Sequence, residues 1–299
     1  MTYSLAVDIG GTFTDAVLRG ADGSVTVDKT LTTHHDLLEG FFRGVDLVLT
    51  KAGVRLEAID GVIVHATTLV TNALIERKGP PTALIITKGF ADVLSIRNEH
   101  RYEMYDPQIE FAEPLIPRHL TFEVDERVLA DGTVLQAVDP AEIEALIPRM
   151  KAAGAVSAAI CLINGFRNSS NERAIAEVLQ AKAPDLYLSL SSSVAPQIRE
   201  YPRASTTAIN AYTAPITAPY LRGLSAGLEE AGAPNRPLIM LSSGGVIGAE
   251  VAARNPVRMI ESGPAAGALA AAYYAERLNL PRLLSFDMGG TTAKACLIE

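Results

Sequence analysis

Two short segments near opposite ends of the chain carry the same pattern of residues able to hold a phosphate, Asp–x–Gly–Gly–Thr. The first begins at Asp8 and the second at Asp287. Apolar residues precede and follow both copies, which predicts two β-hairpins with glycine turns. Glycine leaves the backbone N–H groups of a turn unobstructed and tolerates a positive φ, so successive N–H groups can bind an anion. We therefore expect two related halves, each presenting one phosphate-binding turn.

The side chains around these turns suit a phosphate carrying magnesium. Asp8 and Asp287 are the candidate Mg²⁺ ligands, because magnesium prefers carboxylates together with water and phosphate oxygens. With Asp15, they are also the candidate catalytic carboxylates. A single copy would suit an ordinary tight hairpin equally well, whereas two copies between equivalent strands favour phosphate binding. The predicted nucleotide-binding residues are Gly10, Gly11, Thr12 and Thr14 in the first turn and Gly289, Gly290, Thr291 and Thr292 in the second.

The two copies differ at one position that bears on the metal. Lys294 stands in the second copy where the first has Asp15. A lysine there could contact phosphate directly instead of organising water or metal, so the arrangement of the metal stays open. No Gly-x-x-x-x-Gly-Lys-Ser/Thr segment occurs in the sequence, which excludes a Walker-type loop.

Composition excludes other classes of function. The 299 residues include 26 basic and 34 acidic side chains, for a net charge of -8, whereas a nucleic-acid binder needs a basic surface. Cys161 and Cys296 lie in apolar, strand-like runs, and two isolated thiols build neither a disulfide framework nor a zinc cluster. No secretory leader is visible, and the most apolar stretch, 263–275, is too short to span a bilayer. We expect a cytoplasmic protein with no nucleic-acid or membrane partner.

Strand and helix patterns alternate along the chain, which predicts an α/β fold. Residues 97–120 are polar and aromatic without periodicity, which predicts a long loop of the kind that often carries function. A hairpin is expected around Asp131–Gly132, formed by 122–129 and 133–137. Pro215 and Pro219 are expected to interrupt a helical stretch over 203–231. The other predicted strands are 5–7, 15–18, 25–29, 62–65, 82–87, 157–163, 186–190, 238–241 and 283–286, and the other helices 37–52, 69–78, 141–153, 171–182 and 265–278.

The paired turns resemble the two phosphate loops of the actin, sugar kinase and heat-shock ATPase superfamily. Further segments are similar to signatures of the hydantoinase/oxoprolinase family, A subunit, and they follow in order along nearly the whole chain: 65–79, 87–94, 199–207, 210–212, 242–245 and 262–267. The resemblance implies an actin-like, sugar-kinase-like (ribonuclease H-like) ATPase fold. It divides the chain into a hydantoinase/oxoprolinase N-terminal domain at 1–200 and the start of a hydantoinase A domain at 201–299. Because the second turn lies so near the C-terminus, we expect a longer natural chain.

The resemblance also implies a reaction. Family members use ATP, with Mg²⁺, to phosphorylate the lactam oxygen of a cyclic amide such as a hydantoin or 5-oxoproline, which water then opens with help from a hydantoinase B-like subunit or domain. Positioning and electrostatic stabilisation of the γ-phosphate would dominate this step. The alternatives are a ketone carboxylase subunit of the acetone or acetophenone type, which shares the activation step, and an inactive nucleotide-binding fragment. A sugar kinase is disfavoured, because the chain lacks Glu-x-Gly-His and a cysteine-rich zinc motif.

The segments that carry the resemblance also contain the candidate substrate residues. His65 ends an apolar strand and is a candidate catalytic residue, although a core histidine is an equal alternative. Thr67, Thr68 and Asn72 follow it, and Asn72 could instead be a cap or core amide. Arg97 in the polar loop could hold a carboxylate or phosphate through paired hydrogen bonds, or lie on a solvated face. The family landmark Ser242–Gly245 adds Gly244 and Gly245 to the predicted nucleotide-binding residues.

Overall fold

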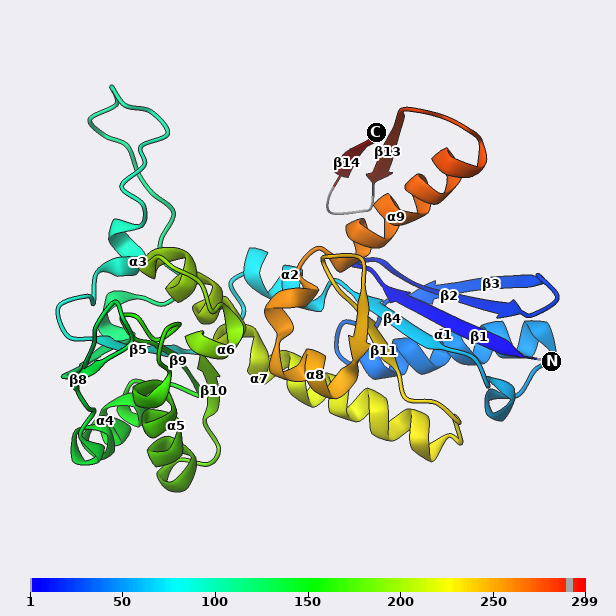
Figure 1. The fold of residues 1–299 in the computed structure, drawn as a ribbon. Coiled ribbons are helices and arrows are strands. Elements are labelled where there is room, and N and C mark those ends of the chain that lie inside the picture. The colour runs from blue at the N-terminus through cyan, green and yellow to red at the C-terminus, as the bar shows by residue number, and fades with distance from the viewer. Residues whose placement is uncertain (1, 289–292) are drawn as a thin grey trace. The chain divides into compact units, whose positions relative to one another are not determined.

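The computed structural model describes residues 2–288 and 293–299 and divides the chain into two compact units (Figure 1). Unit 1 comprises residues 1–76 and 216–299, and unit 2 comprises residues 77–215. The compact units therefore do not follow the linear order of the chain, since unit 1 takes segments from both ends. The predicted division at residue 200 concerns sequence segments and stays a prediction.

Unit 1 is built on a six-stranded mixed sheet in the order β12-β11-β4-β1-β2-β3. β1, β4 and β11 run parallel to one another, so their carboxyl ends lie at the same edge. β2 and β3 continue antiparallel from β1, as the alternating sequence predicts, and β12 pairs antiparallel with β11. The strands are β1 (Tyr3–Ile9), β2 (Phe13–Gly20), β3 (Val25–Leu31), β4 (Ile63–Thr67), β11 (Leu238–Met240) and β12 (Val246–Gly248).

Helices α1 (Leu37–Ala52) and α7 (Glu200–Glu230) contribute to the core on one face of this sheet. Leu5, Val7 and Ile9 alternate along β1 and point into that core together with residues of α1 and α7. The residues between them, Ala6 and Asp8, point to the opposite face and remain exposed. The period-2 pattern of a strand thus places the predicted carboxylate on the open side of the sheet.

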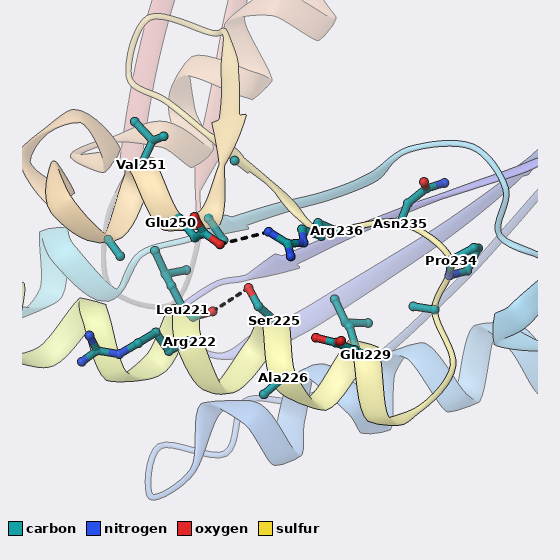
Figure 2. A pocket seen from close by; sticks show the side chains of 15 residues that line it. Leu221, Arg222, Ser225, Ala226, Glu229, Pro234, Asn235, Arg236, Glu250 and Val251 are labelled. Carbon is teal, nitrogen blue, oxygen red and sulfur yellow. Dashed lines mark hydrogen bonds and ion pairs between the residues drawn. The ribbon is translucent and has the colours of Figure 1, made fainter.

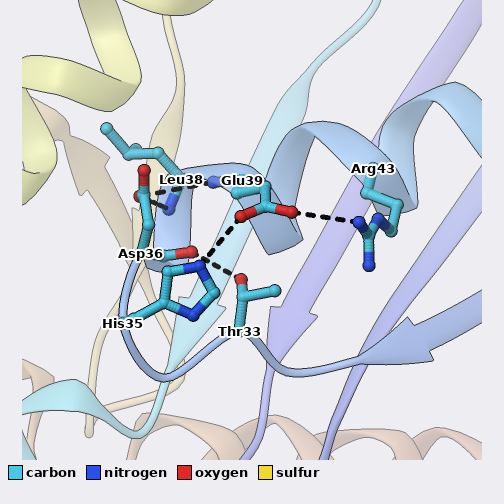
Figure 3. Close-up of polar contacts among 6 residues, drawn as sticks. All are labelled: Thr33, His35, Asp36, Leu38, Glu39 and Arg43. Carbon is cyan, nitrogen blue, oxygen red and sulfur yellow. Dashed lines mark hydrogen bonds and ion pairs between the residues drawn. The ribbon is translucent and has the colours of Figure 1, made fainter.

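The start of α1 is fixed by its own side chains (Figure 3). Asp36 is the N-cap and accepts hydrogen bonds from the N–H groups of Leu38 at 2.9 Å and Glu39 at 3.4 Å. Glu39 in the first turn pairs with His35 and with Arg43, at 3.1 and 3.0 Å. Such a cap is worth about 1 kcal/mol, whereas the exposed ion pairs add a few tenths. The cap holds the chain where it returns from β3 to cover the sheet.

Unit 2 contains a four-stranded sheet in the order β10-β9-β5-β6, and all its strands are parallel. Alternate residues of β5 and β9 enter two separate cores. One core is closed by α4 (Pro140–Ala152) and α5 (Ser170–Lys182), and the other by α3 (Val93–Ile96) and the first turns of α7. Both faces are covered, as expected for a parallel sheet. The strands are β5 (Thr82–Thr87), β6 (Thr121–Val124), β9 (Ser157–Cys161) and β10 (Tyr187–Leu190).

Two predictions about local structure were wrong. The expected hairpin around Asp131–Gly132 is reduced to β7 (Arg127–Val128) and β8 (Val134–Gln136), because residues 121–124 pair in parallel with β5 as β6. Pro215 and Pro219 do not interrupt α7, which is one helix of 31 residues. An interior proline loses one backbone hydrogen bond and its ring crowds the carbonyl of the preceding turn, and the buried face of α7 on both sides of the prolines outweighs that cost.

The remaining elements are short or lie near the C-terminus. Residues 97–117 contain no helix or strand, which confirms the predicted long loop. No described helix is long and apolar enough to cross a membrane. The other helices are α2 (Leu69–Ile75), α6 (Ser191–Val194), α8 (Ala249–Arg254) and α9 (Ser262–Arg277), with 3-10 turns η1 (Leu56–Ala58), η2 (Arg118–Leu120) and η3 (Pro256–Met259), and the last hairpin is β13 (Leu283–Met288) and β14 (Ala293–Ile298).

Candidate functional site

The first glycine turn joins β1 to β2 and lies at the carboxyl edge of the unit 1 sheet. The Gly10 N–H donates to the Phe13 carbonyl at 2.9 Å, which closes the turn. Neither Gly10 nor Gly11 takes a positive φ, so the conformational reason expected from the sequence is wrong. The reason at Gly10 is space, because a Cβ there would lie 3.2 Å from the Phe13 oxygen. Glycine at this position therefore lets the turn close tightly on the Phe13 carbonyl.

The two threonines of the first turn point in different directions. Thr12 is exposed, whereas Thr14 is fully buried. The Thr32 hydroxyl donates to the Gly10 carbonyl at 2.9 Å, so Thr14 donates to Thr32 across 3.3 Å. The Thr14 hydroxyl thus supports the turn from its buried side, through Thr32. Thr12 is the threonine that a phosphate could reach, because its side chain is exposed. Thr32 was missed from the sequence because nothing local marks it as a partner of this turn.

The carboxylates form matched cross-strand pairs in the two hairpins. Asp8 lies opposite Asp15 in the β1–β2 register, and Asp287 lies opposite Lys294 in the β13–β14 register. Both hairpins are antiparallel, which confirms that prediction. The turn of the second hairpin, Gly289 to Thr292, lies outside the described residues. The repeated motif therefore produces the same strand register twice but a different charge balance.

The pKa of the Asp8 carboxyl depends on charged groups of both hairpins. Asp8 keeps part of its surface exposed, but the protein atoms around its carboxyl desolvate it and raise its pKa above the usual value, and the nearby carboxylates of Asp15 and Asp287 raise this pKa further. The Lys294 ammonium acts in the opposite direction. Asp8 and Asp287, from opposite ends of the chain, are therefore close enough to repel each other. A cation between them would relieve that repulsion.

Lys294 is held at the start of α9. Its Nζ lies 2.8 Å from the Glu261 carboxylate. Glu261 has a φ of 59° and occupies the N-cap position of α9, and its N–H donates to the Thr71 hydroxyl at 3.1 Å. The Ser262 hydroxyl lies 3.5 Å from the Thr67 carbonyl. Thr71 was missed from the sequence, although the unusual Glu–Ser–Gly–Pro start of α9 was a usable signal.

The segment that joins β4 to α2 also borders the first turn. The Thr68 N–H and hydroxyl both donate to the Ile9 carbonyl, at 3.1 and 3.3 Å. The Asn72 amide donates to the Thr68 hydroxyl at 3.1 Å. Thr67 is buried, and its hydroxyl accepts from the Leu69 N–H at 3.2 Å. Among the predicted substrate residues, half-buried Thr68 and Asn72 are thus placed beside the end of β1.

His65 lies in the middle of β4 and is fully buried. Its Nδ1–H donates to the Val7 carbonyl at 3.0 Å, and its Nε2 accepts from the Tyr220 hydroxyl at 2.8 Å. Burial lowers the pKa of the imidazole to about 4, so His65 is neutral at physiological pH. Burial also raises the pKa of Tyr220, which keeps that donor protonated. Both ring nitrogens are occupied, which favours a positioning role over substrate contact.

The other predicted residues fall in two places. The 241–245 turn follows β11 and so lies at the same sheet edge as the first glycine turn. Gly244 has a φ of 81°, and a Cβ there would meet the Leu269 side chain of α9 at 2.5 Å. Arg97 belongs to unit 2, where it lines a cavity of about 400 Å³.

A cavity of about 570 Å³ in unit 1 lies elsewhere (Figure 2). Residues of α7 and α8 and the chain before β11 line it, and Glu250 and Arg236 face each other across it at 3.0 Å. Asn235 at its rim donates to the carbonyls of Asp60 and Gly61, which precede β4. This cavity is therefore near the amino end of β4, whereas the glycine turn follows the carboxyl end of β1.

The residues at the paired hairpins fit a magnesium–phosphate ligand. Mg²⁺ is usually held by one or two carboxylates, with water and phosphate oxygens completing its shell. Asp8 and Asp287 supply that number, and exposed Thr12 in the adjoining turn supplies a hydroxyl for phosphate. In the described part of the chain no three His, Cys, Asp or Glu side chains are grouped to hold a metal by themselves. The arrangement thus suits a metal that arrives with its phosphate.

The α/β fold with two such hairpins is of the ATPase type that the sequence predicted. The profile of the hydantoinase/oxoprolinase N-terminal region matches residues 4–183, and the hydantoinase/oxoprolinase profile matches residues 203–299. The chain belongs to the hydantoinase/oxoprolinase family, which confirms the resemblance drawn from its sequence.

Three relatives show the range of the family. Caprolactamase subunit alpha of Pseudomonas jessenii is 33% identical over 97% of this chain, and 5-oxoprolinase of Saccharomyces cerevisiae is 30% identical over 96%. The crystal structure of the ATP-dependent caprolactamase superposes over 98% of this chain with a TM-score of 0.86. The nucleotide-free structure of acetone carboxylase superposes over 99% with a TM-score of 0.88 at 27% identity. The chain spans 43% of both solved structures, 42% of the caprolactamase sequence and 25% of the 5-oxoprolinase sequence.

Proposed function

We propose that this chain binds Mg-ATP between its two glycine hairpins and forms the nucleotide-handling part of an enzyme that hydrolyses a cyclic amide of the hydantoin or 5-oxoproline type. The observation that carries the proposal is that both copies of the repeated motif form antiparallel hairpins in the same register, with Asp287 near enough for its charge to raise the Asp8 pKa. Caprolactamase and 5-oxoprolinase, both amide-ring hydrolases by name, support the substrate class.

ATP would supply the phosphoryl group that makes the lactam carbon electrophilic: water adds to that carbon, the ring C–N bond breaks as nitrogen takes a proton, and the phosphoryl group is released by hydrolysis as phosphate. Asp8 and Asp287 would hold the accompanying Mg²⁺, with the Gly10–Thr12 turn against the phosphates. Thr68 and Asn72 border the same edge and would face the substrate. His65 keeps β1 and β4 in register through the Val7 carbonyl and so holds Asp8 in position. Attack by water would then need a hydantoinase B-like partner.

The proposal is tested with Asp8→Asn and Asp287→Asn in the protein assembled with its B-like partner. Removing one carboxylate from each hairpin should lower lactam-dependent ADP release by roughly 10²–10³-fold, as the loss of a transition-state electrostatic contact does. Asp22→Asn, in the exposed β2–β3 turn, is the matched control and should leave the rate unchanged. If Asp287→Asn keeps the normal affinity for Mg-ATP and the normal rate, the two hairpins do not share a nucleotide.

A second candidate is ATP-dependent ketone carboxylation, favoured by the superposition on acetone carboxylase. The two reactions share phosphorylation of a carbonyl oxygen and differ in the nucleophile that attacks the activated carbon or its enol. The rate of ADP release is therefore measured with hydantoin, 5-oxoproline or caprolactam as substrate, and compared with the rate when acetone and bicarbonate are supplied instead. A lactam-dependent signal supports hydrolysis, and a signal that requires both ketone and bicarbonate supports carboxylation.

A further inference from the structure

The cavity of unit 2 lies at the end of its parallel sheet where ligands bind in such folds. Gly89 and Phe90, which line it, directly follow β5, and Arg199 to Tyr201 follow β10 and α6. The chain leaves β5 toward β6 on one side and leaves β9 toward β10 on the other. In open parallel sheets the crevice outside the carboxyl ends, at such a reversal of strand order, is the usual binding place. The position therefore favours a ligand site.

Two arginines border this cavity, and both are held in unusual backbone conformations. Arg97 ends α3 with a φ of 59° and a ψ of -133°, and Arg199 precedes α7 with a φ of 82°. A residue with a Cβ adopts a positive φ only when its surroundings enforce it, and such residues cluster at ligand sites. The long 97–117 loop extends from this end of unit 2 (Figure 1).

The two guanidinium groups differ in the contacts that they make. Arg97 donates to the Ala112 carbonyl and lies 5.1 Å from the centre of the Phe111 ring, so the loop fixes it. Arg199 is exposed and forms no hydrogen bond or ion pair with any residue that the structure describes. Arg199 thus keeps the full set of planar N–H donors that binds a carboxylate in pairs.

The remaining lining residues set the class of ligand. Phe90, Val93 and Ile96 give the cavity an apolar part. Asp92 is already paired with Arg118 at 2.7 Å, but Glu200 leaves an acidic group beside Arg199. That carboxylate would repel a doubly charged phosphate more than a singly charged acid. A volume of about 400 Å³ admits a molecule of small-metabolite size.

We propose that this cavity is a binding site for a small organic carboxylate with an apolar body, which Arg199 holds by paired hydrogen bonds. The site does not depend on the nucleotide proposal, because it belongs to unit 2 and to residues that the hairpins do not contain. Its ligand is either a carboxylate-bearing lactam, bound here in addition to the substrate place proposed in unit 1, or an acid that the reaction does not consume. The carboxylate is the chemistry that both share.

The test is calorimetric titration of the intact protein without nucleotide. Cyclopentanecarboxylate and 5-oxoproline should bind, whereas the uncharged isostere cyclopentanecarboxamide should not. Arg199→Gln should weaken binding of both acids by about tenfold or more, the usual effect of losing a charged hydrogen-bond pair. Arg199→Lys should recover part of that loss, since it keeps the charge but not the planar donors. Arg101→Gln, which changes an exposed arginine of the 97–117 loop outside the cavity lining, is the matched control and should change nothing.

Both sources of the ligand remain distinguishable in this titration. Tighter binding of 5-oxoproline than of cyclopentanecarboxylate identifies a lactam acid, and equal binding identifies a general acid site. The proposal is overturned if neither acid binds at millimolar concentration, if Arg199→Gln binds them as the unchanged protein does, or if inorganic phosphate displaces them more effectively than they displace each other. Circular dichroism confirms that the variants fold, which is expected because Arg199 is exposed.

Discussion

The two glycine hairpins have the same motif and the same register but differ in how deeply their apolar side chains are buried. Leu5, Val7 and Ile9 of the first hairpin are 1–2% exposed, because α1 and α7 pack on them. Their counterparts in the second hairpin, Leu284, Phe286 and Met288, are 66, 63 and 72% exposed among the described residues. A repeated motif therefore specifies a strand pair and its turn, while burial depends on which helices the rest of the chain supplies.

The hairpins also differ in charge. The first sets Asp8 opposite Asp15, and the second sets Asp287 opposite Lys294. Two carboxylates opposite one another are destabilising unless a cation lies nearby, whereas the Asp287–Lys294 pair compensates itself. Within the described structure, Lys294 is also the one cation whose charge lowers the Asp8 pKa. The second hairpin thus brings to the site a positive charge that the first hairpin lacks.

The largest effect should come from truncating equivalent leucines. Leu5→Ala removes a fully buried side chain and should lower the free energy of unfolding by about 2–5 kcal/mol. Leu284→Ala removes an exposed one and should change it by less than about 0.5 kcal/mol. Urea denaturation of both variants checks the comparison. Equal losses would show that the second hairpin is buried in solution.

The next effect concerns His65, which anchors only the first hairpin. Its pKa of about 4 in the folded protein lies below the ordinary 6.5, so the unfolded chain binds more protons between these values. The stability that neutral His65 contributes is fully present above pH 6.5 and is lost as the pH falls toward 4, by on the order of 3 kcal/mol.

Denaturation at several pH values checks this sign. His65→Gln should flatten the fall in stability between pH 6.5 and 4, although it lowers stability at neutral pH. His100→Gln, an exposed histidine of the long loop, is the control and should keep the original slope. An unchanged slope in His65→Gln would mean that the imidazole is protonated within the fold.

The smallest effect is expected from replacing Lys294, which stands in the second hairpin where the first has Asp15. Lys294→Met leaves Glu261 unpaired and removes the positive charge acting on Asp8, so Mg-ATP affinity should fall by about tenfold. Lys29→Met is the control, because Lys29 lies opposite Asp15 on β3 but is not among the charges that shift the Asp8 pKa. Titration with Mg-ATP compares the two. If Lys29→Met weakens binding more, Lys294 is only a structural partner of Glu261.

Much of the fold was accessible from short-range patterns. Alternation of apolar residues predicted β1 to β3, and helical spacing predicted α1 at its observed bounds. The patterns failed where pairing over a distance decided the outcome. Residues 121–124 joined β5 instead of a local hairpin, and α7 continued through two prolines because both of its ends are buried in cores.

For the site, the sequence supplied the chemistry but not the directions of the side chains. Thr12 and Thr14 looked equivalent, yet strand alternation turned Thr14 inward to Thr32. His65 looked available, yet α7 covers it and supplies the Tyr220 hydroxyl. Alternation fixes that Thr12 and Thr14 differ in direction from Phe13, but which face is buried depends on α1, which packs on Thr14, and on α7, which covers His65.

The sequence by itself determined the two glycine turns, the carboxylate that precedes each, and the family, because a motif and its flanking strands are short-range properties of the chain. Only the tertiary structure decided that Asp8 and Asp287 act on each other and that Lys294 pairs with Glu261. Those interactions join segments from opposite ends of the chain, because the start of α9 meets α2 where the Glu261 N–H donates to the Thr71 hydroxyl, and no local pattern encodes that pairing.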